Sequence, residues 1–468
     1  MNSHLLFLVA YSLLLIVLGL VIGRFVKTTG AFFVAGRQLG PGLLFATLLA
    51  ANIGGASTVG AAGLGYRDGL SAWWWGGSAA IGSILLAFWV GPRLWRLAKR
   101  YDLWTVGDFL EHRYTSSVRG IVAVLLWVGA LAILAGQLIA ISTILNVVAG
   151  VPRILGCVIG GAVMTTYFAA GGLLTSAWVN AVQLVVLLGG FALALPMALT
   201  AVGGWSAVMA TEAAANPAYT SFWRGGGSGW IYLAMLVPAF IVSPGILQKT
   251  FGARDEKTIR IAVSANALVL LLFAFVPPLL GMIARVNHPQ LLSHENALAT
   301  VLVNELPLAV GTLGLAAVFS AELSSCDAIL FMLSTSLSKD LYHRFVNPGA
   351  SEEQILKAAR LAAVAGGVLG VLLALVMPTV IGALKIFYSL LSVSLFVPIV
   401  AGLHYRRAGT PEALAAIGVG ISVLLAVHLH TEGVGFGAWT PALIGLMASG
   451  LGFAVMVVAR IRVPSKEL

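Results

Sequence analysis

Charged residues are scarce in this sequence. Asp, Glu, Lys and Arg make up only 9% of the 468 residues, whereas 59% are hydrophobic. Soluble domains carry roughly 25% charged residues, so the composition excludes that class. Uncharged stretches of about 20 residues recur along the whole chain, which is the length that a helix needs to cross a bilayer. We therefore expect an all-α polytopic membrane protein with about thirteen transmembrane helices.

Cysteines and common catalytic motifs are also scarce. The only two cysteines, Cys157 and Cys326, both fall in apolar stretches, which argues against a disulfide framework. The sequence has no HExxH or GxSxG motif, and its eight histidines fall in loops or near the ends of predicted helices. A serine nucleophile needs a neighbouring base, so this pattern argues against an intramembrane enzyme. We predict no enzymatic activity and no cofactor.

Acidic residues are outnumbered, which gives a formal net charge of +10. Most of the Lys and Arg, Lys249 among them, fall in alternate loops, whereas Lys385 lies inside a predicted helix. Cytoplasmic loops carry such an excess, so we expect an outside N-terminus and a cytoplasmic C-terminus in a bacterial inner membrane. The basic charge needs no nucleic acid to explain it. The lipid bilayer is the predicted partner, and a monomer is sufficient.

Two of the predicted helices are interrupted near mid-depth. The stretch LLAANIGGASTVGAAGLG, Leu48–Gly65, and the stretch MLVPAFIVSPGILQ, Met235–Gln248, carry glycine or proline there. Unwound backbone inside a membrane survives only where it lines a cavity, and its free carbonyls are suitable sodium ligands. The breaks lie five helices apart, which indicates a secondary transporter built from two inverted repeats. Glycine and proline are also common in membrane helices in general, which is the plainer interpretation of either break alone.

This pattern divides the chain into four parts. They are an extra N-terminal helix and loop (1–40), a first five-helix repeat (41–205), a second five-helix repeat (206–408) and two C-terminal helices with a short tail (409–468).

Hydroxyl groups are concentrated in the stretch LSSCDA, Leu323–Ala328, in the middle of an apolar helix. On helical spacing Ser320, Ser324 and Asp327 share one face, and Ser325 lies about 100° round from Ser324. Hydroxyls and free carbonyls together form an oxygen cage of low charge, which suits a monovalent hard cation better than calcium. The alternative is that these serines only join helices by hydrogen bonds.

Five motifs in order resemble the sodium:solute symporter family, which includes proline, pantothenate, sialic acid and sugar cotransporters. They are AANI (50–53), GGLLTSAWVNAVQ (171–183), QKTFGARDEKTIR (248–260), LSSCDAILFMLSTSLSKDLY (323–342) and GLHYRRAG (402–409). The resemblance implies a leucine-transporter-like fold of five plus five inverted helices, with one helix before them and two after. It also implies a sodium site formed by the carbonyls of Ala50, Ile53 and Ala321 and the hydroxyls of Ser324 and Ser325.

The sequence departs from the family at one position. Many members carry an aspartate that contributes to a second sodium site, and this chain has Asn180 there. The loss of that charge favours one sodium ion per solute. Asp327 is the residue that would substitute as a second ion or proton site, and its plainer interpretation is a buried, hydrogen-bonded carboxylate.

Lys385 is the first candidate for solute recognition, because ionisable groups inside a membrane are costly and usually functional. Two alternatives together have the same weight as this role. Lys385 could form an ion pair with Glu322 or Asp327, or its ammonium group could reach the outer surface. Asn52, Ser57, Trp75 and Gln137 are the other predicted substrate residues. Such a pocket suits a small organic anion, such as a monocarboxylate, or an amino acid.

The remaining alternatives share the predicted architecture. They are a proton-coupled symporter, a sugar or nucleobase symporter, a channel and a transporter-like sensor component. Sodium uptake that depends on solute and saturates separates a symporter from a channel.

Overall fold

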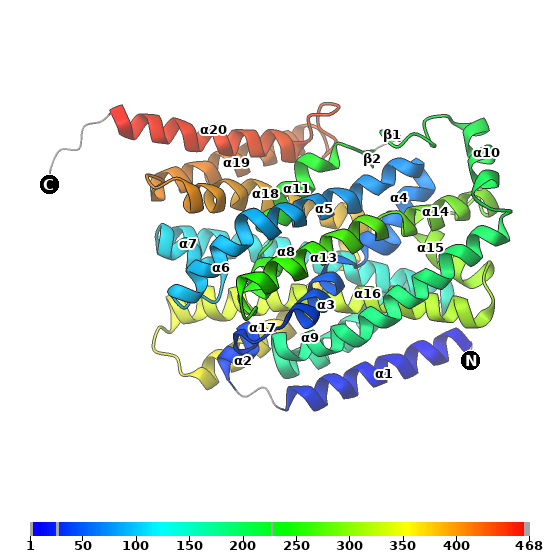
Figure 1. Ribbon diagram of the computed structural model, residues 1–468, viewed down its shortest axis with the longest axis horizontal. Coiled ribbons are helices and arrows are strands. Elements are labelled where there is room, and N and C mark those ends of the chain that lie inside the picture. The colour runs from blue at the N-terminus through cyan, green and yellow to red at the C-terminus, as the bar shows by residue number, and fades with distance from the viewer. Residues whose placement is uncertain (1–2, 25–27, 226–227, 463–468) are drawn as a thin grey trace.

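The protein is almost wholly helical in a computed structural model that describes residues 3–24, 28–225 and 228–462 (Figure 1). The α-helices are α1 (Ser3–Gly23), α2 (Thr29–Val34), α3 (Pro41–Asn52), α4 (Ala61–Asp68), α5 (Trp73–Leu85), α6 (Gly91–Arg100), α7 (Val106–Arg113), α8 (Ser116–Ala149), α9 (Arg153–Ala201), α10 (Trp205–Ala215), α11 (Tyr232–Val242), α12 (Pro244–Phe251), α13 (Glu256–Phe273), α14 (Val276–Asn287), α15 (Ala297–Asn304), α16 (Leu308–Thr335), α17 (Glu352–Val376), α18 (Val380–His404), α19 (Thr410–His430) and α20 (Pro441–Arg462).

Short tighter or wider helical turns and one hairpin complete the fold. The 3₁₀ turns are η1 (Ala35–Arg37), η3 (Gly69–Ala72) and η5 (His294–Asn296), and the π-helical segments are η2 (Ala56–Gly60), η4 (Leu86–Val90) and η6 (Ser336–Val346). Strands β1 (Arg224–Gly225) and β2 (Ser228–Gly229) pair antiparallel.

The helices are long and apolar enough for a multi-pass membrane protein. Within the described residues, 11 helical ranges have the length and composition to cross a bilayer, and two shorter apolar helices are Pro41–Asn52 and Arg153–Thr166. The all-α, multi-pass prediction is therefore confirmed. The count of thirteen crossings is not confirmed, and the boundaries of the two repeats also stay predictions.

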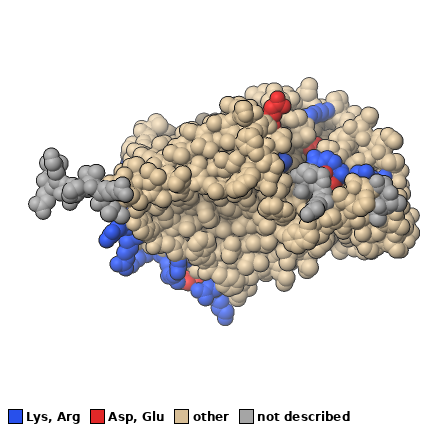
Figure 2. All heavy atoms as spheres, turned by 90° about the horizontal axis from the view of Figure 1, so that it is seen from above, with Lys and Arg blue, Asp and Glu red and all other residues tan. Residues whose placement is uncertain are grey.

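The helices run along the long axis of the molecule, with α1 at one edge and α19 and α20 at the other (Figure 1). On the face shown in Figure 2, Lys and Arg gather toward the two ends, and most of the surface between them carries no charge. An uncharged belt between charged ends is the surface that a bilayer requires.

Helix α16 lies at the centre of the bundle. It packs against α9, α8, α17 and α3, and every residue from Gly314 to Thr335 is buried. A helix surrounded by other helices needs no polar face, which explains its nearly continuous apolar sequence. The polar side chains of LSSCDA therefore lie in the protein interior rather than in lipid.

Both predicted helix breaks are present. Helix α3 ends at Asn52, where Ile53 is extended (φ −100°, ψ 99°), and the chain becomes helical again at η2. Helix α11 ends at Val242, where Ser243 leaves the helical region (φ −55°, ψ 116°), because Pro244 disfavours a helical residue before it. Pro244 then takes the first position of α12, where its missing N–H costs nothing.

Candidate functional site

The first helix break and the serine pair on α16 are in direct contact. The Ser324 hydroxyl donates to the Ala50 carbonyl at 2.8 Å and to the Ala321 carbonyl at 3.1 Å. The Ser325 hydroxyl lies 3.4 Å from the same Ala50 oxygen and 3.3 Å from the Ala51 oxygen. All of these groups are neutral oxygens, which is the ligand chemistry that an alkali metal ion prefers. Ile53 is fully buried at the break itself.

Glycines at the break allow this close approach. A Cβ on Gly54 would lie 2.2 Å from the Ser325 hydroxyl, and a Cβ on Gly55 would lie 2.6 Å from a carboxylate oxygen of Glu322. The Gln137 side chain on α8 accepts the Gly55 N–H at 2.5 Å, and so satisfies a backbone group that the break releases. No larger residue fits at either position without movement of the neighbouring side chains.

Glu322 also contacts the broken helix. Its Oε1 atom accepts a hydrogen bond from the Thr58 hydroxyl at 2.7 Å, and Thr58 donates to the Gly54 carbonyl at 2.9 Å as well. The carboxyl group therefore joins α16 to η2. Lys385 was predicted as an alternative ion-pair partner of Glu322, and the structure instead gives Glu322 a hydroxyl partner.

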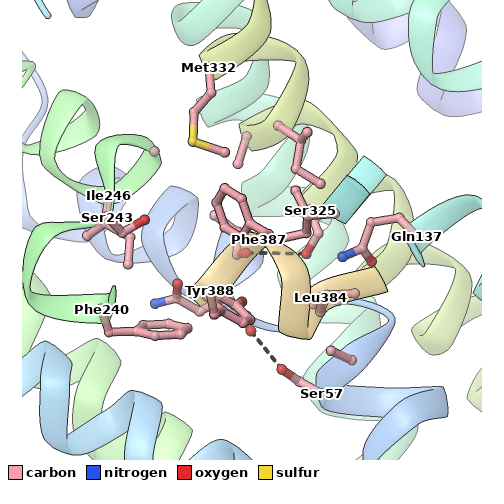
Figure 3. A pocket seen from close by; sticks show the side chains of 18 residues that line it. Ser57, Gln137, Phe240, Ser243, Ile246, Ser325, Met332, Leu384, Phe387 and Tyr388 are labelled. Carbon is pink, nitrogen blue, oxygen red and sulfur yellow. Dashed lines mark hydrogen bonds between the residues drawn. The ribbon is translucent and has the colours of Figure 1, made fainter. Parts of the chain in front are cut away.

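A cavity lies beside the oxygen cage, where both broken helices meet α8, α16 and α18 (Figure 3). Its lining contains the polar side chains of Asn52, Ser57, Gln137, Ser243 and Ser325. Its larger apolar and aromatic side chains are Ile133, Phe240, Ile246, Ile329, Met332, Leu384, Phe387 and Tyr388. None of the described lining residues is Asp, Glu, Lys, Arg or His, so the lining is formally neutral.

Three of the predicted substrate residues belong to this lining. Asn52, Ser57 and Gln137 all face the cavity. The Ser57 hydroxyl donates to the Asn52 carbonyl at 2.9 Å, and the Asn52 amide donates to Asn266 on α13 at 3.1 Å. These bonds fix the side chains at the first break in one arrangement.

Trp75 and Lys385 do not belong to the lining. Trp75 is buried behind it, with its ring edge-on to Tyr232 at 5.1 Å and to Tyr388 at 6.1 Å between centroids. Lys385 is exposed on α18, and its ammonium lies 5.6 Å from the centroid of the Tyr232 ring. The cavity therefore lacks the positive charge that Lys385 was predicted to supply, because the face of α18 that meets it carries Leu384, Phe387 and Tyr388 instead.

Lys249 is the clearest correction to the sequence analysis. The charge pattern put it in a cytoplasmic loop, but its side chain is only 1% exposed on α12. The ammonium donates to the carbonyl of Thr47 at 2.8 Å and to the hydroxyl of Thr47 at 3.1 Å. Thr47 also accepts from the Asn180 amide at 3.3 Å, and Asp327 attracts the Lys249 charge electrostatically.

The sequence analysis missed other residues as well. Phe240, Phe387 and Tyr388 lie in apolar helices with no pattern that separates cavity lining from core. Ser243 had a usable signal, because it directly precedes Pro244 at the second predicted break.

Two interrupted helices that meet beside an oxygen cage and a neutral cavity, in a multi-pass bundle, define a secondary transporter. The sequence comparison then gives the family. The pattern of the sodium:solute symporter family matches residues 32–420, and the chain belongs to this family. Its members are sodium-coupled transporters rather than enzymes. The predicted family and the prediction that the protein is not an enzyme are therefore both confirmed.

Curated relatives of the chain transport different solutes. The sodium/pantothenate symporter of Escherichia coli is 30% identical over 96% of this chain and 95% of that protein. The sodium/glucose cotransporter of Vibrio parahaemolyticus is 25% identical over 86% and 80%, and the osmoregulated proline transporter of Bacillus subtilis is 25% identical over 86% and 84%. These relatives agree on the family of the chain, but they do not identify its solute.

Solved structures support the fold. A substrate-bound, outward-open sodium-coupled sialic acid symporter matches with a TM-score of 0.83 at 20% identity, and the match covers 99% of both chains. A nucleobase-cation-symport-1 transporter in a closed conformation matches with a TM-score of 0.58 at 17% identity, over 94% of this chain and 97% of that one. The predicted leucine-transporter-like fold agrees with both neighbours.

Proposed function

We propose that the protein couples the inward movement of sodium to the uptake of a small organic monocarboxylate with polar groups, of which pantothenate is the model compound. The observation that carries the sodium part is the contact between Ala50 and the Ser324–Ser325 pair. The choice of solute is supported by the relative with 30% identity over almost the whole chain.

The N-terminus of α12 supports an anionic solute in a neutral cavity. Ser243, Gly245 and Ile246 line the cavity at the first turn of this helix. Pro244 has no N–H, and the Ile246 N–H donates to the Ser243 carbonyl at 3.1 Å, so the Gly245 N–H is the donor that this turn can offer to a solute. The helix dipole places partial positive charge at the same end. Half-helices in transporters bind substrate carboxylates in this way. We assign the attraction for the carboxylate to α12, and Lys385 is not needed for it.

The rest of the lining suits a solute that is partly polar and partly apolar. Asn52, Ser57 and Gln137 offer amide and hydroxyl groups, which match the amide and hydroxyl groups of a pantothenate-like compound. Phe240, Phe387 and neighbouring aliphatic side chains offer apolar area for its carbon skeleton.

Coupling follows from binding linkage. A sodium ion held by α3 and α16 would replace the hydrogen bonds of Ser324 and Ser325 with ion contacts, and would fix the broken helix against α16. Because Asn52 and Ser57 belong to the same broken segment, that fixation would favour the arrangement that holds solute. Solute binding then favours sodium binding by the same free energy.

Location and orientation are part of the proposal. We place the protein in a bacterial inner membrane with the N-terminus outside and the C-terminus in the cytoplasm. The excess of Lys and Arg in alternate loops supports this orientation.

The test is uptake of labelled pantothenate into proteoliposomes with an imposed inward sodium gradient. We expect uptake that falls to background when choline replaces sodium at fixed pH. An excess of unlabelled pantothenate should compete, whereas panthenol, in which an alcohol replaces the carboxylate, should not. Competition by proline or glucose in place of pantothenate would reassign the solute, and undiminished uptake in choline would reject sodium coupling.

A further inference from the structure

Lys249 is a positive charge in the interior of the helical bundle. Its side chain lies in the range Tyr232–Phe251, which has the length and composition of a membrane span, and only 1% of it is exposed. An ammonium group at such a place is costly unless several polar groups compensate it. The sodium-coupling scheme above does not use this charge.

The groups around Lys249 come from three other helices. Thr47 on α3 accepts two hydrogen bonds from the ammonium group, at 2.8 Å and 3.1 Å. Asn180 on α9 donates to the same Thr47 hydroxyl at 3.3 Å. Asp327 on α16 is fully buried and attracts the ammonium. The ammonium thus lies where a metal cation could lie, in contact with a carbonyl and a hydroxyl oxygen of Thr47 and under the influence of a buried carboxylate.

This cluster lies directly beside the serine cage. Thr47 precedes Ala50 by three residues on α3, and Asp327 follows Ser324 by three residues on α16. Because Ala50 touches Ser324, the cluster is three residues, about 4.5 Å, further along both helices. The same two helices therefore hold the serine cage and the Lys249 cluster side by side.

We propose that the ammonium group of Lys249 is a built-in cation, which takes the place of a second sodium ion next to the serine cage and limits the transporter to one sodium ion per solute. A sodium ion at this place would need the two oxygen atoms of Thr47 that the ammonium already contacts. Two positive charges a few ångströms apart in this interior repel strongly, because the effective dielectric constant there is far below that of water. This inference rests on the proposed sodium-coupled function and adds its stoichiometry.

The neutral Asn180 agrees with this assignment. An aspartate at 180 would add a second carboxylate near the ammonium, and the pair of carboxylates would exceed the single positive charge of Lys249. With asparagine, Lys249 and Asp327 balance each other. The charge of the cluster is thus complete without an ion from solution.

The experiment counts sodium ions in the full-length protein. The number of sodium ions moved per pantothenate is obtained from the membrane potential at which coupled flux reverses in proteoliposomes, for the wild type, Lys249→Met and a control, Lys257→Met. Lys257 is exposed near the start of α13, so its loss leaves the cluster intact. We expect one sodium per solute for the wild type and the control. For Lys249→Met we expect a ratio that rises toward two, with a Hill coefficient for sodium above one.

Two outcomes overturn the proposal. One is a ratio of two in the wild type, and the other is a ratio of one in Lys249→Met with transport retained. If Lys249→Met does not fold, the pair Lys249→Met with Asp327→Asn removes both charges at once, which is less harmful than one unbalanced buried charge. This neutral pair should keep a ratio of one, and a ratio of two for it contradicts the proposal. The complete absence of sodium-dependent uptake in the wild type would instead reject the proposed function itself.

Discussion

Individual hydroxyl groups on α16 have different partners although they lie within two turns. Ser324 and Ser325 contact the carbonyls of the broken helix α3, whereas Ser320 bonds to the Tyr11 hydroxyl at 2.6 Å and to the Ala316 carbonyl at 2.7 Å. All three are buried serines on one helix. Their partners, rather than their residue type, determine which of them can hold an ion.

Replacement of Ser324 by alanine tests this difference. Ser324→Ala removes one proposed ion ligand, and an interaction with a charged group is worth roughly 1.5–3 kcal/mol. We expect the sodium concentration for half-maximal uptake to rise by about 10-fold or more. Ser320→Ala is the matched control and should leave that concentration within about twofold. An equal effect of both variants on sodium affinity would mean that the serines only join helices.

Residue identity alone was sufficient for part of the site. The serine pair was found because hydroxyls are rare within an apolar helix, and the broken segment was found because glycine interrupts it, whereas Ala50 itself came from the resemblance to the family. Lys249 was misplaced because basic residues follow it closely, so its segment resembled the basic loop that begins after α12. Burial of a lysine depends on partners from distant helices, here Thr47 and Asp327. The local composition around Lys249 does not identify these partners.

At the scale of single elements, the broken helix depends on glycines that face other side chains. A Cβ at Gly55 would lie 2.6 Å from Glu322, 2.9 Å from Ala140 and 2.9 Å from the Gln137 oxygen. By contrast, a Cβ at Gly42 on α3 would meet no atom within 4 Å. The two glycines therefore differ in what a methyl group would displace.

The pair Gly55→Ala and Gly42→Ala tests the break. Gly55→Ala must displace Glu322 or Gln137, and overpacking in a buried site costs roughly 1–3 kcal/mol. We expect uptake to fall at least 10-fold, with a lower thermal unfolding midpoint in detergent. Gly42→Ala should transport as the wild type does, since alanine favours a helix interior. Normal uptake by Gly55→Ala would show that transport does not require the close approach of Gly55 to Glu322 and Gln137.

At the same scale, the breaks were predictable and the orientation of α18 was not. Pro244 and the glycines at 54 and 55 are local signals, since each changes the backbone directly. Which face of α18 meets the cavity depends on the helices packed against it. The sequence therefore indicated this helix through Lys385, whereas Leu384, Phe387 and Tyr388 are the residues that reach the cavity.

At the scale of the whole molecule, one buried arginine joins parts of the chain that are far apart in the sequence. Arg119 on α8 makes ion pairs with Asp108 and Glu111 on α7 and with Asp340 on η6, each at 2.8 Å. The Arg119 side chain is 7% exposed, and Arg344 adds a second partner for Glu111. This cluster fixes a loop helix against two helices of the bundle.

Removal of Arg119 should therefore affect stability strongly. Arg119→Leu leaves three carboxylates close together without their shared partner, and the loss of one member of a buried ion pair costs about 3–5 kcal/mol. We expect a thermal unfolding midpoint several degrees lower in detergent. Arg96→Leu, which breaks an exposed pair with Glu256, should cost at most about 1 kcal/mol. Similar midpoints for the two variants would contradict the buried role of Arg119.

The pH dependence of stability provides a separate measurement of the same cluster. Burial alone would raise the pKa of Glu111, but hydrogen bonds from Arg344 and Arg119 outweigh it and lower that pKa below its ordinary value. A carboxyl group whose pKa is lower in the folded protein stabilises the fold at a pH above its unfolded value of about 4.3, and this stabilisation is lost as the pH falls through the lower, folded value. We expect the unfolding midpoint of the wild type to fall steeply on acidification below about pH 4.3. The midpoint of Glu111→Gln should fall less steeply, because glutamine has no carboxylate that can bind a proton. Glu353→Gln, at an exposed position near the start of α17, should follow the wild type. Parallel curves for wild type and Glu111→Gln would place the acid sensitivity elsewhere in the molecule.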